Sequence, residues 1–427
     1  MKICVVGSGH VGLVTGACFA ELGNEVKCID NDANKVETLK GGRIPFYEPG
    51  LNELVARNVS EGRLSFSTDI PEGSRSAEVV FICVGTPPRE DGTPDLSSVE
   101  NVAREIASAS RSYKVIVEKS TVPVRTAEWL DTILKRYIRS EYDIASNPEF
   151  LREGSAVRDF LHPDRIVIGT NSPRADQILT EVYKPLNAPI VHTDIKSAEL
   201  IKHCANAFLA MKISFINLVA QLCDAVGTDV EMVRMGIGSD KRIGLEFLNA
   251  GLGYGGFCFP KDLGAFISVF EQHGLDATLL KSVAAVNTAQ RFIFVQKVKE
   301  ALGSLEGKAL GVLGLSFKPD TDDIRFAPSL DVVGALLRER ATIRAYDPQA
   351  MEDFRAVFPD VTYCENPFEA AEGADALLIL TEWREFQELD LLRIRTLLKN
   401  PIIVDGRNMF SRQRLARLGF KYLCMGK

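Results

Sequence analysis

The chain has 427 residues, of which 46% are hydrophobic and 25% charged, and its formal net charge is −7. This length predicts two or three domains, and the mild acidity argues against nucleic acid as a partner. Nine scattered cysteines, with no Cys-x-x-Cys spacing, argue against zinc and for a reducing, cytoplasmic location. No signal-peptide core is visible, and Lys212 and Asp224 interrupt the most apolar stretch, 205–226, so we expect no membrane span.

The N-terminus carries a dinucleotide-binding pattern. Residues 2–6 have the character of a buried strand, and Gly7, Gly9 and Gly12 of a Gly-x-Gly-x-x-Gly sequence lead into an apolar helix over 13–22. In this setting the first glycine makes the turn, the second admits a pyrophosphate, and the third lets the helix pack on the strand. The pyrophosphate would then meet the N-terminus of that helix.

The second predicted strand, 25–29, ends at Asp30. A carboxylate at this point would accept hydrogen bonds from the adenosine ribose hydroxyls and repel a 2′-phosphate. NAD is therefore favoured over NADP as the cofactor, although Lys35 could also lie near the ribose.

Two further predicted strands, 79–84 and 114–118, each end in a loop that bears hydroxyl groups. Ligands bind outside the carboxyl ends of parallel strands, so Thr86 and Thr121 are candidates for the cofactor site and reaction centre. The alternative is that these threonines cap the helices that follow.

The segment Asn147–Gly154 resembles a helix start, with Asn147 as N-cap and Pro148 in the first turn. Glu149 and Glu153 are four residues apart and would share one face of that helix. The alternative is that these carboxylates only complement the helix dipole.

A long helix is predicted over 195–226, with Gly227 as the residue that ends it. Thr228 and Glu231 would then form a capping box for the next helix. A helix that is apolar on more than one face fits a domain connector that also builds a dimer interface.

Lys202 and Asn206 are four residues apart on this predicted helix. A lysine and an amide on one face could both donate hydrogen bonds to a developing oxyanion. The alternative is a lysine that reaches solvent along the helix surface and an asparagine that only packs.

The segment Gly255–Asp262 is the most informative in the chain. Pro260 favours the first turn of a helix, so Cys258 is predicted at a helix N-terminus, where the dipole favours a thiolate. Lys261 and Asp262 would lie within reach of the sulfur. The alternative is a small buried cysteine without a chemical role.

The strand pattern begins again after Gly307. The predicted strands are 309–313, 342–346, 376–380 and 402–404. They echo the first domain, but the glycine fingerprint is replaced by a loop of charged residues over 315–325. A second nucleotide held mainly by Lys318 is one interpretation, and a plain scaffold domain is the other.

Together these motifs resemble the UDP-glucose 6-dehydrogenases within the wider family of nucleotide-sugar dehydrogenases, over essentially the whole chain. The motifs are Gly7-x-Gly9-x-Val11-Gly12, Gly85-Thr86-Pro87, Ser120-Thr121-Val122, Asn147–Gly154, Lys202 with Asn206, Arg242-Ile243-Gly244, Phe247-Leu248, Gly255–Asp262 and Phe317–Arg325. The resemblance implies an α/β fold with two Rossmann-like parallel-sheet domains joined by a long central helix and a helical dimerisation region. The expected domains are an NAD-binding domain (1–194), a central helical domain with the catalytic cysteine (195–302) and a UDP-sugar-binding domain (303–427).

The resemblance also implies roles for individual residues. The catalytic set is Cys258 as nucleophile, Lys202 and Asn206 as oxyanion donors, Asp262 beside the thiol, and Glu149 and Thr121 near the hydrolytic water. The residues expected to bind NAD are Gly7, Gly9, Val11, Gly12, Asp30, Lys35, Thr86, Thr121, Glu153, Lys261 and Arg325. Those expected to bind the nucleotide sugar are Glu149, Phe150, Leu151, Arg152, Glu153, Lys202, Asn206, Phe247, Leu248, Asn249, Gly251, Gly255 and Lys318, with Arg242 reaching across a subunit boundary of a homodimer.

The implied reaction is the four-electron oxidation of UDP-glucose to UDP-glucuronate, through a thiohemiacetal and a thioester on Cys258. Three positions depart from the family pattern: His10 replaces a tyrosine, Phe257 a serine and Ala250 a proline. These departures leave open GDP-mannose or UDP-N-acetyl-hexosamine as the substrate. The rival classes are a single-step dehydrogenase of the 6-phosphogluconate type and a non-catalytic NAD-binding protein.

Overall fold

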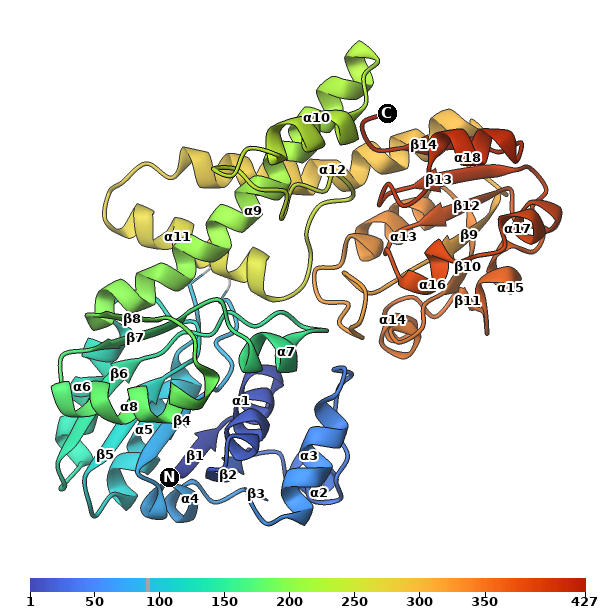
Figure 1. Cartoon of the computed structure of the whole chain (residues 1–427). Helices are drawn as coiled ribbons and strands as arrows, with labels where there is room; N and C mark the ends of the chain where they lie inside the picture. The colour runs from blue at the N-terminus through green and yellow to red at the C-terminus, as the bar shows by residue number, and fades with distance from the viewer. Residues whose placement is uncertain (90–92) are drawn as a thin grey trace. The chain divides into compact units, whose positions relative to one another are not determined.

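The computed structural model describes residues 1–89 and 93–427. The chain forms two compact units, of which the first comprises residues 1–205 with 264–274 and the second residues 206–263 with 275–427. Each unit contains one twisted sheet flanked by helices, as Figure 1 shows for each sheet by itself. The α/β class predicted from the sequence is confirmed.

The sheet of the first unit has the strand order β3-β2-β1-β4-β5-β6-β7-β8. Its strands are β1 (Lys2–Val6), β2 (Glu25–Ile29), β3 (Leu64–Ser67), β4 (Val79–Ile82), β5 (Lys114–Glu118), β6 (Tyr142–Ser146), β7 (Ile166–Thr170) and β8 (Ile190–Thr193). Its helices are α1 (His10–Glu21), α2 (Ala33–Lys40), α3 (Leu51–Ser60), α4 (Ile70–Ser76), α5 (Ser97–Ala109), α6 (Thr126–Tyr137), α7 (Ala156–Leu161) and α8 (Pro173–Tyr183), with a 3₁₀ turn over Lys184–Leu186. Neighbouring strands are parallel except β6 and β7, so the carboxyl ends of β1, β4, β5 and β6 share one edge.

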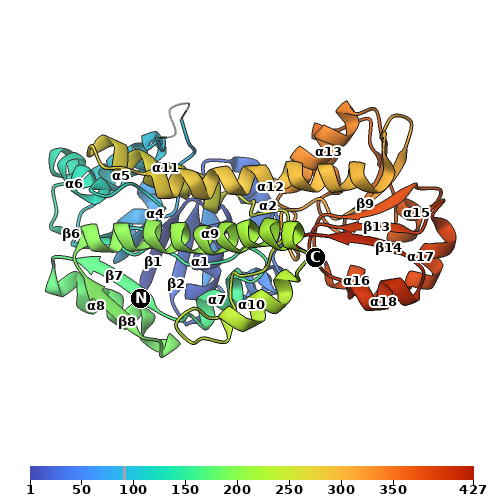
Figure 2. The same ribbon diagram turned by 90° about the horizontal axis from the view of Figure 1, so that it is seen from above.

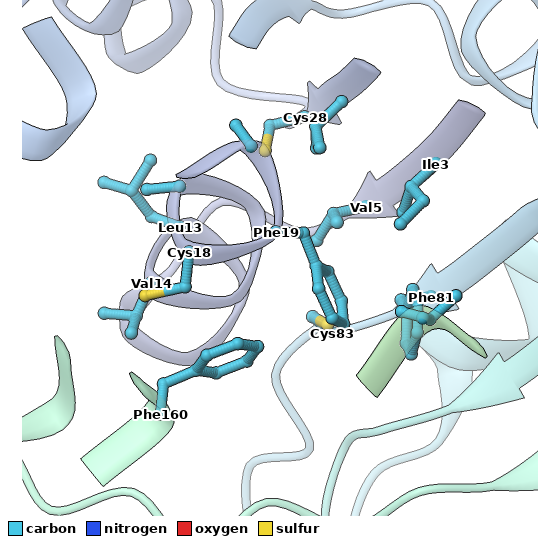
Figure 3. Close-up of a cluster of buried hydrophobic side chains, with 14 of the residues drawn as sticks. Ile3, Val5, Leu13, Val14, Cys18, Phe19, Cys28, Phe81, Cys83 and Phe160 are labelled. Carbon is cyan, nitrogen blue, oxygen red and sulfur yellow. The ribbon is translucent and has the colours of Figure 1, made fainter. Parts of the chain in front are cut away.

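The core of the first unit forms where α1 packs on the sheet (Figure 3). Phe19 of α1 is fully buried, and its ring centroid lies 4.9 Å from that of Phe81 and 5.2 Å from that of Phe160. The central strands are runs of valine, isoleucine and cysteine, as expected for a parallel sheet covered on both faces. This core holds the start of α1 at the strand ends.

The second unit begins within a long helix. Its helices before the second sheet are α9 (Ile195–Val226), which starts in the first unit, α10 (Val230–Gly238), α11 (Cys258–Gln272), which ends in the first unit, and α12 (Thr278–Leu302). In the second unit α9 and α12 lie side by side (Figure 2), and Ser214 Oγ donates to Val283 O at 2.8 Å. Lys297 Nζ and Asp224 Oδ2 form an ion pair of 2.9 Å between the same helices. The predicted bounds of α9 are confirmed.

By length and composition alone, α9 could cross a membrane, and 33% of its most apolar window is buried. A single such helix is weak evidence, because a core helix of a soluble protein passes the same test. Polar groups of α9 bind other segments of the second unit: Lys212 Nζ donates to Ile243 O at 2.9 Å, and Asn217 Oδ1 accepts from Gly251 N at 2.8 Å.

The sheet of the second unit has the order β11-β10-β9-β12-β13-β14 and is parallel throughout. Its strands are β9 (Ala309–Leu313), β10 (Thr342–Tyr346), β11 (Thr362–Tyr363), β12 (Ala376–Ile379), β13 (Ile402–Asp405) and β14 (Lys421–Cys424). Its helices are α13 (Pro328–Arg338), α14 (Met351–Val357), α15 (Pro367–Ala371), α16 (Arg384–Gln387), α17 (Leu391–Leu397) and α18 (Arg412–Arg417). Residues of α12 to α14 pack on one face, and residues of α15 to α18 on the other.

The predicted echo between the two sheets is confirmed, since this order repeats β3-β2-β1-β4-β5-β6 of the first sheet. The two sheets also share an acidic residue at the corresponding position. Asp30 Oδ2 accepts from Ser8 N at 2.9 Å after the first strand of its sheet, and Asp347 Oδ2 accepts from Leu315 N at 2.7 Å at the corresponding place. In both sheets a carboxylate at the end of the second strand binds the turn after the first.

The predicted capping box at the start of α10 is wrong. Gly227 ends α9 with a φ of +74°, as predicted, but the N-cap of α10 is Asp229, whose Oδ1 accepts from Glu231 N at 2.8 Å. The carboxylate of Asp229 stands directly before the first helical residue, so it takes the capping position that was assigned to Thr228.

Candidate active site

The glycine fingerprint has the close approaches that its sequence predicts. A Cβ on Gly7, whose φ is +98°, would lie 2.6 Å from Cys83 O, and a Cβ on Gly12 would lie 1.8 Å from Gly7 O. Gly9 is the N-cap of α1 without a side-chain cap, and no atom lies within 4 Å of a Cβ placed there. The first N–H groups of α1, including that of half-buried Val11, therefore remain available to a phosphate group.

The carboxylate of Asp30 is buried at the end of β2. Burial raises its pKa, but hydrogen bonds from Lys35 Nζ and from the N–H groups of Asp32 and Ser8 outweigh this, and the pKa lies below its usual value. The Lys35 ammonium lies 2.9 Å from Asp30 Oδ2. Lys35 is thus the direct partner of this carboxylate, which stays ionised and can accept hydrogen bonds from ribose hydroxyls.

Thr86 and Thr121 lie on neighbouring loops at the ends of β4 and β5. Thr86 Oγ1 donates to Thr121 O at 2.9 Å, so a side chain of one loop holds the backbone of the other. Neither threonine is a helix cap, because the N-cap residues of α5 and α6 are Leu96 and Arg125. The capping alternative is therefore wrong for both.

The predicted helix at Asn147–Gly154 is also wrong, because residues 147–155 form a loop and α7 begins at Ala156. Asn147 cannot cap a helix: its Oδ1 accepts from Lys119 Nζ at 2.9 Å and its Nδ2 donates to Val167 O at 2.8 Å. Glu149 Oε2 accepts from Leu151 N at 2.6 Å and closes a local turn instead. Glu149 and Glu153 do not share a helix face.

Lys202 and Glu149 form a buried ion pair, with 2.9 Å between Nζ and Oε1 and about 5% of each side chain exposed. The Lys202 ammonium also lies 5.5 Å from the ring centroid of Phe150. The alternative in which Lys202 reaches solvent is excluded by this burial. This pairing is not predicted by the sequence pattern. Neither is a role for Lys119, whose only signal is its place directly after a buried strand.

Cys258 is the first residue of α11, as predicted, and it is half-buried and forms no disulfide. Gly256 precedes it with a φ of +77°, and a Cβ there would lie 2.8 Å from the ring of Phe317. The turn before the helix therefore requires a glycine for its backbone conformation and for its packing. This turn places the thiol at the N-terminal end of the helix dipole.

The carboxylate of Asp262 lies one turn after Cys258 and is almost completely buried. Its Oδ1 pairs with Lys261 Nζ at 2.7 Å, and its Oδ2 accepts from Asn206 Nδ2 at 2.6 Å. Asn206 therefore does more than pack, and an amide nitrogen carries a second N–H that could bind another acceptor. The carboxylate of Asp262 thus joins the lysine by an ion pair and the amide by a hydrogen bond, all within the second unit.

Two cations flank the ring of Phe257, the residue before the cysteine. Arg325 lies 4.6 Å and Lys261 Nζ 5.6 Å from its centroid, and Arg325 also pairs with Asp323 at 2.7 Å. Lys318 lies 5.6 Å from the ring centroid of Phe317 in the same loop region. These are basic groups suited to an anionic ligand.

Two glycines of the predicted sugar-binding set lie against backbone. A Cβ on Gly255 would lie 2.6 Å from Phe326 O, and one on Gly251 would lie 2.7 Å from Gly406 O. Phe247 has a φ of +62°, Leu248 is buried and Asn249 is exposed. The loop over 247–256 is therefore tightly packed against other backbone segments at Gly251 and Gly255.

The two arginines of the predicted set both bind acidic neighbours. Arg152 pairs with Asp159 at 2.7 Å, and Arg242, with 89% of its side chain exposed, pairs with Asp240 at 2.6 Å. The exposure of Arg242 leaves it accessible to a ligand or to another chain.

His10 has a role that the sequence analysis did not anticipate. Its Nε2 lies 2.8 Å from Oε2 of the buried Glu48, whose carboxylate also accepts from Gly154 N at 2.7 Å and from Ala156 N at 2.8 Å. The fingerprint helix is thereby fastened to the loop that carries Glu149.

The sequence matches three domain families of the UDP-glucose/GDP-mannose dehydrogenases. These are the NAD binding domain over residues 1–187, the central domain over 196–289 and the UDP binding domain over 311–412. The chain is 46% identical to the UDP-glucose 6-dehydrogenase TuaD of Bacillus subtilis, over 100% of this chain and 93% of that protein.

Solved structures resemble the chain over its whole length. A UDP-glucose dehydrogenase from the archaeon Pyrobaculum islandicum matches with a TM-score of 0.92 and 41% identity, covering 99% of this chain and 96% of that one. A UDP-D-ManNAc dehydrogenase from Pyrococcus horikoshii matches with a TM-score of 0.88 and 26% identity, covering 100% and 99%.

Proposed function

The chain belongs to the UDP-glucose/GDP-mannose dehydrogenase family, and we infer that it oxidises UDP-glucose to UDP-glucuronate with NAD as the oxidant. The choice among nucleotide sugars rests on identity: 46% to a UDP-glucose 6-dehydrogenase, against 26% to a UDP-D-ManNAc dehydrogenase. The observation that carries the reaction type is the thiol of Cys258 at the start of α11, one turn before the buried Asp262.

The residues at the ends of β1 and β2 suit a dinucleotide. The open space at Gly9 and the uncapped start of α1 would receive the pyrophosphate, and the ionised Asp30 would accept hydrogen bonds from the ribose. Each NAD molecule, when bound, would take up one hydride, so two NAD molecules would be consumed for each sugar oxidised. A 2′-phosphate would meet the Asp30 carboxylate, which supports NAD over NADP.

We assign the covalent step to Cys258. The C6 alcohol of the sugar loses a hydride and a proton to become an aldehyde, and the sulfur of Cys258 adds to the aldehyde carbon to give a thiohemiacetal. Loss of a second hydride and proton gives a thioester. Water then adds to the thioester carbon, the C–S bond breaks, and the carboxylate leaves while the thiol is restored.

Polar groups of the chain would serve these steps as donors and acceptors. Each tetrahedral species carries an oxyanion, to which Lys202 and Asn206 can donate hydrogen bonds. Asp262 is suited to take the proton of the thiol and of the hydrolytic water, with Glu149 and Thr121 orienting that water. An ion pair between Glu149 and Lys202 and a hydrogen bond between Asn206 and Asp262 hold these four side chains in place.

The remaining assignments of the sequence analysis form part of this proposal. Residues 1–194 would bind NAD, 195–302 would carry the nucleophile, and 303–427 would bind the UDP group, with Lys318 among its ligands. The nine scattered cysteines, which show no Cys-x-x-Cys spacing, support the proposal of a cytoplasmic enzyme.

We also propose that the chain forms a homodimer through α9. In the second unit this helix exposes a row of large apolar side chains: Phe208, Phe215, Leu218, Leu222 and Val226, each 52–65% exposed. Three of them, at 208, 215 and 222, follow a seven-residue repeat, which suits the packing of one helix on its own copy.

The deciding experiment measures NADH formed per sugar consumed, with UDP-glucose and excess NAD. Two NADH per UDP-glucose, with GDP-mannose and UDP-N-acetylglucosamine inert, would support the proposal. One NADH per sugar would instead support the single-step class and leave Cys258 without a chemical role. Binding without turnover of any sugar would favour a non-catalytic protein.

A second experiment isolates the thiol. Cys258→Ser should nearly abolish UDP-glucuronate formation while NAD binding persists. Cys204→Ser is the matched control, because Cys204 is the cysteine most open to solvent in this chain. Near-normal turnover by Cys258→Ser would refute the covalent mechanism.

A further inference from the structure

Lys119 is a buried lysine directly after β5, with 4% of its surface exposed. Its ammonium donates to Asn147 Oδ1 at 2.9 Å, to Asn147 O at 3.4 Å and to Tyr183 Oη at 3.3 Å. All three acceptors are neutral, so these hydrogen bonds place no negative charge beside the ammonium. Burying a charge in this way is unfavourable, and such a residue calls for a reason beyond packing.

Lys119 binds Asn147, which lies two residues before Glu149 in the chain. Asn147 is held at every polar group: its N–H donates to Glu118 O at 2.9 Å, its Nδ2 donates to Val167 O at 2.8 Å, and both its oxygens accept from Lys119. Pro148 follows and has a restricted φ. Lys119 therefore fixes the position of Asn147 and, through it, restricts the position of the Glu149 backbone.

Lys119 adds a second buried ammonium group to the region of the Glu149–Lys202 ion pair. Two buried ammonium groups would stabilise an oxyanion that forms beside them.

The pKa of Lys119 reflects these surroundings. Burial lowers it to about 8, the nearby Lys202 lowers it as well, and Cys83 and Glu149 act in the opposite direction. Tyr183, from α8, is the other titratable group that faces the ammonium. Lys119 is thus mostly charged at neutral pH and loses its proton within a range that an activity assay can reach.

We propose that Lys119 is a positioning residue for the oxidation of the sugar: through Asn147 it holds Glu149 against Lys202, and it adds a second ammonium group to this buried region. This inference rests on the proposed function, because it concerns the oxyanions of that reaction. Lys119 is thereby assigned an action through the Glu149–Lys202 pair and not by direct contact with the substrate or the cofactor.

The chain offers a matched control on the same strand. Lys114 is the first residue of β5, is fully buried and donates to Arg75 O at 3.1 Å and Ala77 O at 2.7 Å. Burial also lowers the pKa of Lys114. It lies at the end of the strand opposite to the ligand-binding edge, so Lys114→Met removes a similar buried charge without touching Glu149.

The experiment compares wild type, Lys119→Met and Lys114→Met with UDP-glucose and NAD. Lys119→Met should lower kcat by about 100-fold, as expected when a catalytic group is slightly misplaced, and should leave the Kd for NAD within about twofold. Lys114→Met should retain kcat within about twofold of wild type. Equal effects of the two substitutions on kcat would overturn the proposal.

The pH profile is the readout that a purely structural role would not change. In wild type and Lys114→Met, kcat/KM for UDP-glucose should decline above pH 8, the approximate pKa of Lys119, as the ammonium deprotonates. This decline should be missing from Lys119→Met. A decline that persists unchanged in that variant would also overturn the proposal.

Tyr183→Phe provides a test if Lys119→Met does not fold. Loss of the Tyr183 oxygen removes one acceptor from the ammonium, so the pKa of Lys119 should fall and the decline should begin at lower pH. An unmoved decline would contradict the proposal. Wild type that makes no UDP-glucuronate would refute the proposed function instead, so the two failures are distinguishable.

Discussion

Replacing Glu199 by glutamine should change how the stability of the first unit depends on pH. Glu199 lies in α9 and is buried, with 2% of its surface exposed. Its carboxylate accepts from Arg125 N at 2.6 Å and from Ala127 N at 2.8 Å, which fastens the first turn of α6. The residue therefore ties the loop after Thr121 to the long helix.

The size of the change in the free energy of unfolding follows from the pKa of Glu199. Burial raises this pKa from 4.5 to about 7, although the two N–H groups act to lower it. The folded protein thus binds this proton more tightly than the unfolded chain does. Its stabilising effect is complete below pH 4.5 and is lost as pH rises to about 7. The pKa difference corresponds to roughly 3 kcal/mol of unfolding free energy.

Glutamine does not titrate, so the free energy of unfolding of wild type relative to Glu199→Gln should fall by roughly 3 kcal/mol from pH 4.5 to pH 8. Urea unfolding can be followed through Trp129 of α6, which becomes the only tryptophan in a Trp383→Phe background because the chain has two. Glu128→Gln is the control, since the half-exposed carboxylate of Glu128 on α6 pairs with Lys196 of α9 and with Arg125, the N-cap residue of α6. Parallel pH curves for wild type and Glu199→Gln would refute the reasoning.

Three further results are expected. Gly12→Ala should lower the melting temperature, because its Cβ would meet Gly7 O, whereas Gly9→Ala should fold normally and weaken NAD binding in a titration; equal stability of the two variants would contradict the packing argument. Asp30→Asn should raise the KM for NAD roughly tenfold with little change in kcat, because a charged acceptor for the ribose is lost, and an unchanged KM would argue against this site. Leu222→Glu should shift a dimer toward monomer in sedimentation, and an unaltered mass would exclude this face of α9 as the interface.

Elements whose signal is local were predicted well. The apolar runs of β1, β5 and β9 predicted buried strands, and all three have the expected bounds. Pro260 indicated the start of α11, because a proline suits the first turn of a helix and disfavours its interior. In each case the type of the element and its bounds depend only on residues that are adjacent in the sequence.

The errors arose where a side chain had a distant partner. Asn147 has a sequence context typical of an N-cap, yet its amide is occupied by Lys119 and Val167, and the segment after it is a loop. Thr86 and Thr121 could have capped helices on local grounds, but a hydrogen bond between their loops occupies Thr86. Local propensity is a weak term, and these tertiary contacts outweigh it.

The sequence by itself determined the α/β class, the second run of strands that echoes the first, the nucleotide fingerprint and the cysteine at a helix start, since these depend on periodicity and on the backbone preferences of glycine and proline. Only the tertiary structure decided which polar groups meet. Glu149 reaches Lys202 across 53 residues of chain, and Asn206 reaches Asp262 across 56. Such pairs form because a buried charge or amide must find a partner, and which partner is near depends on how the whole chain packs.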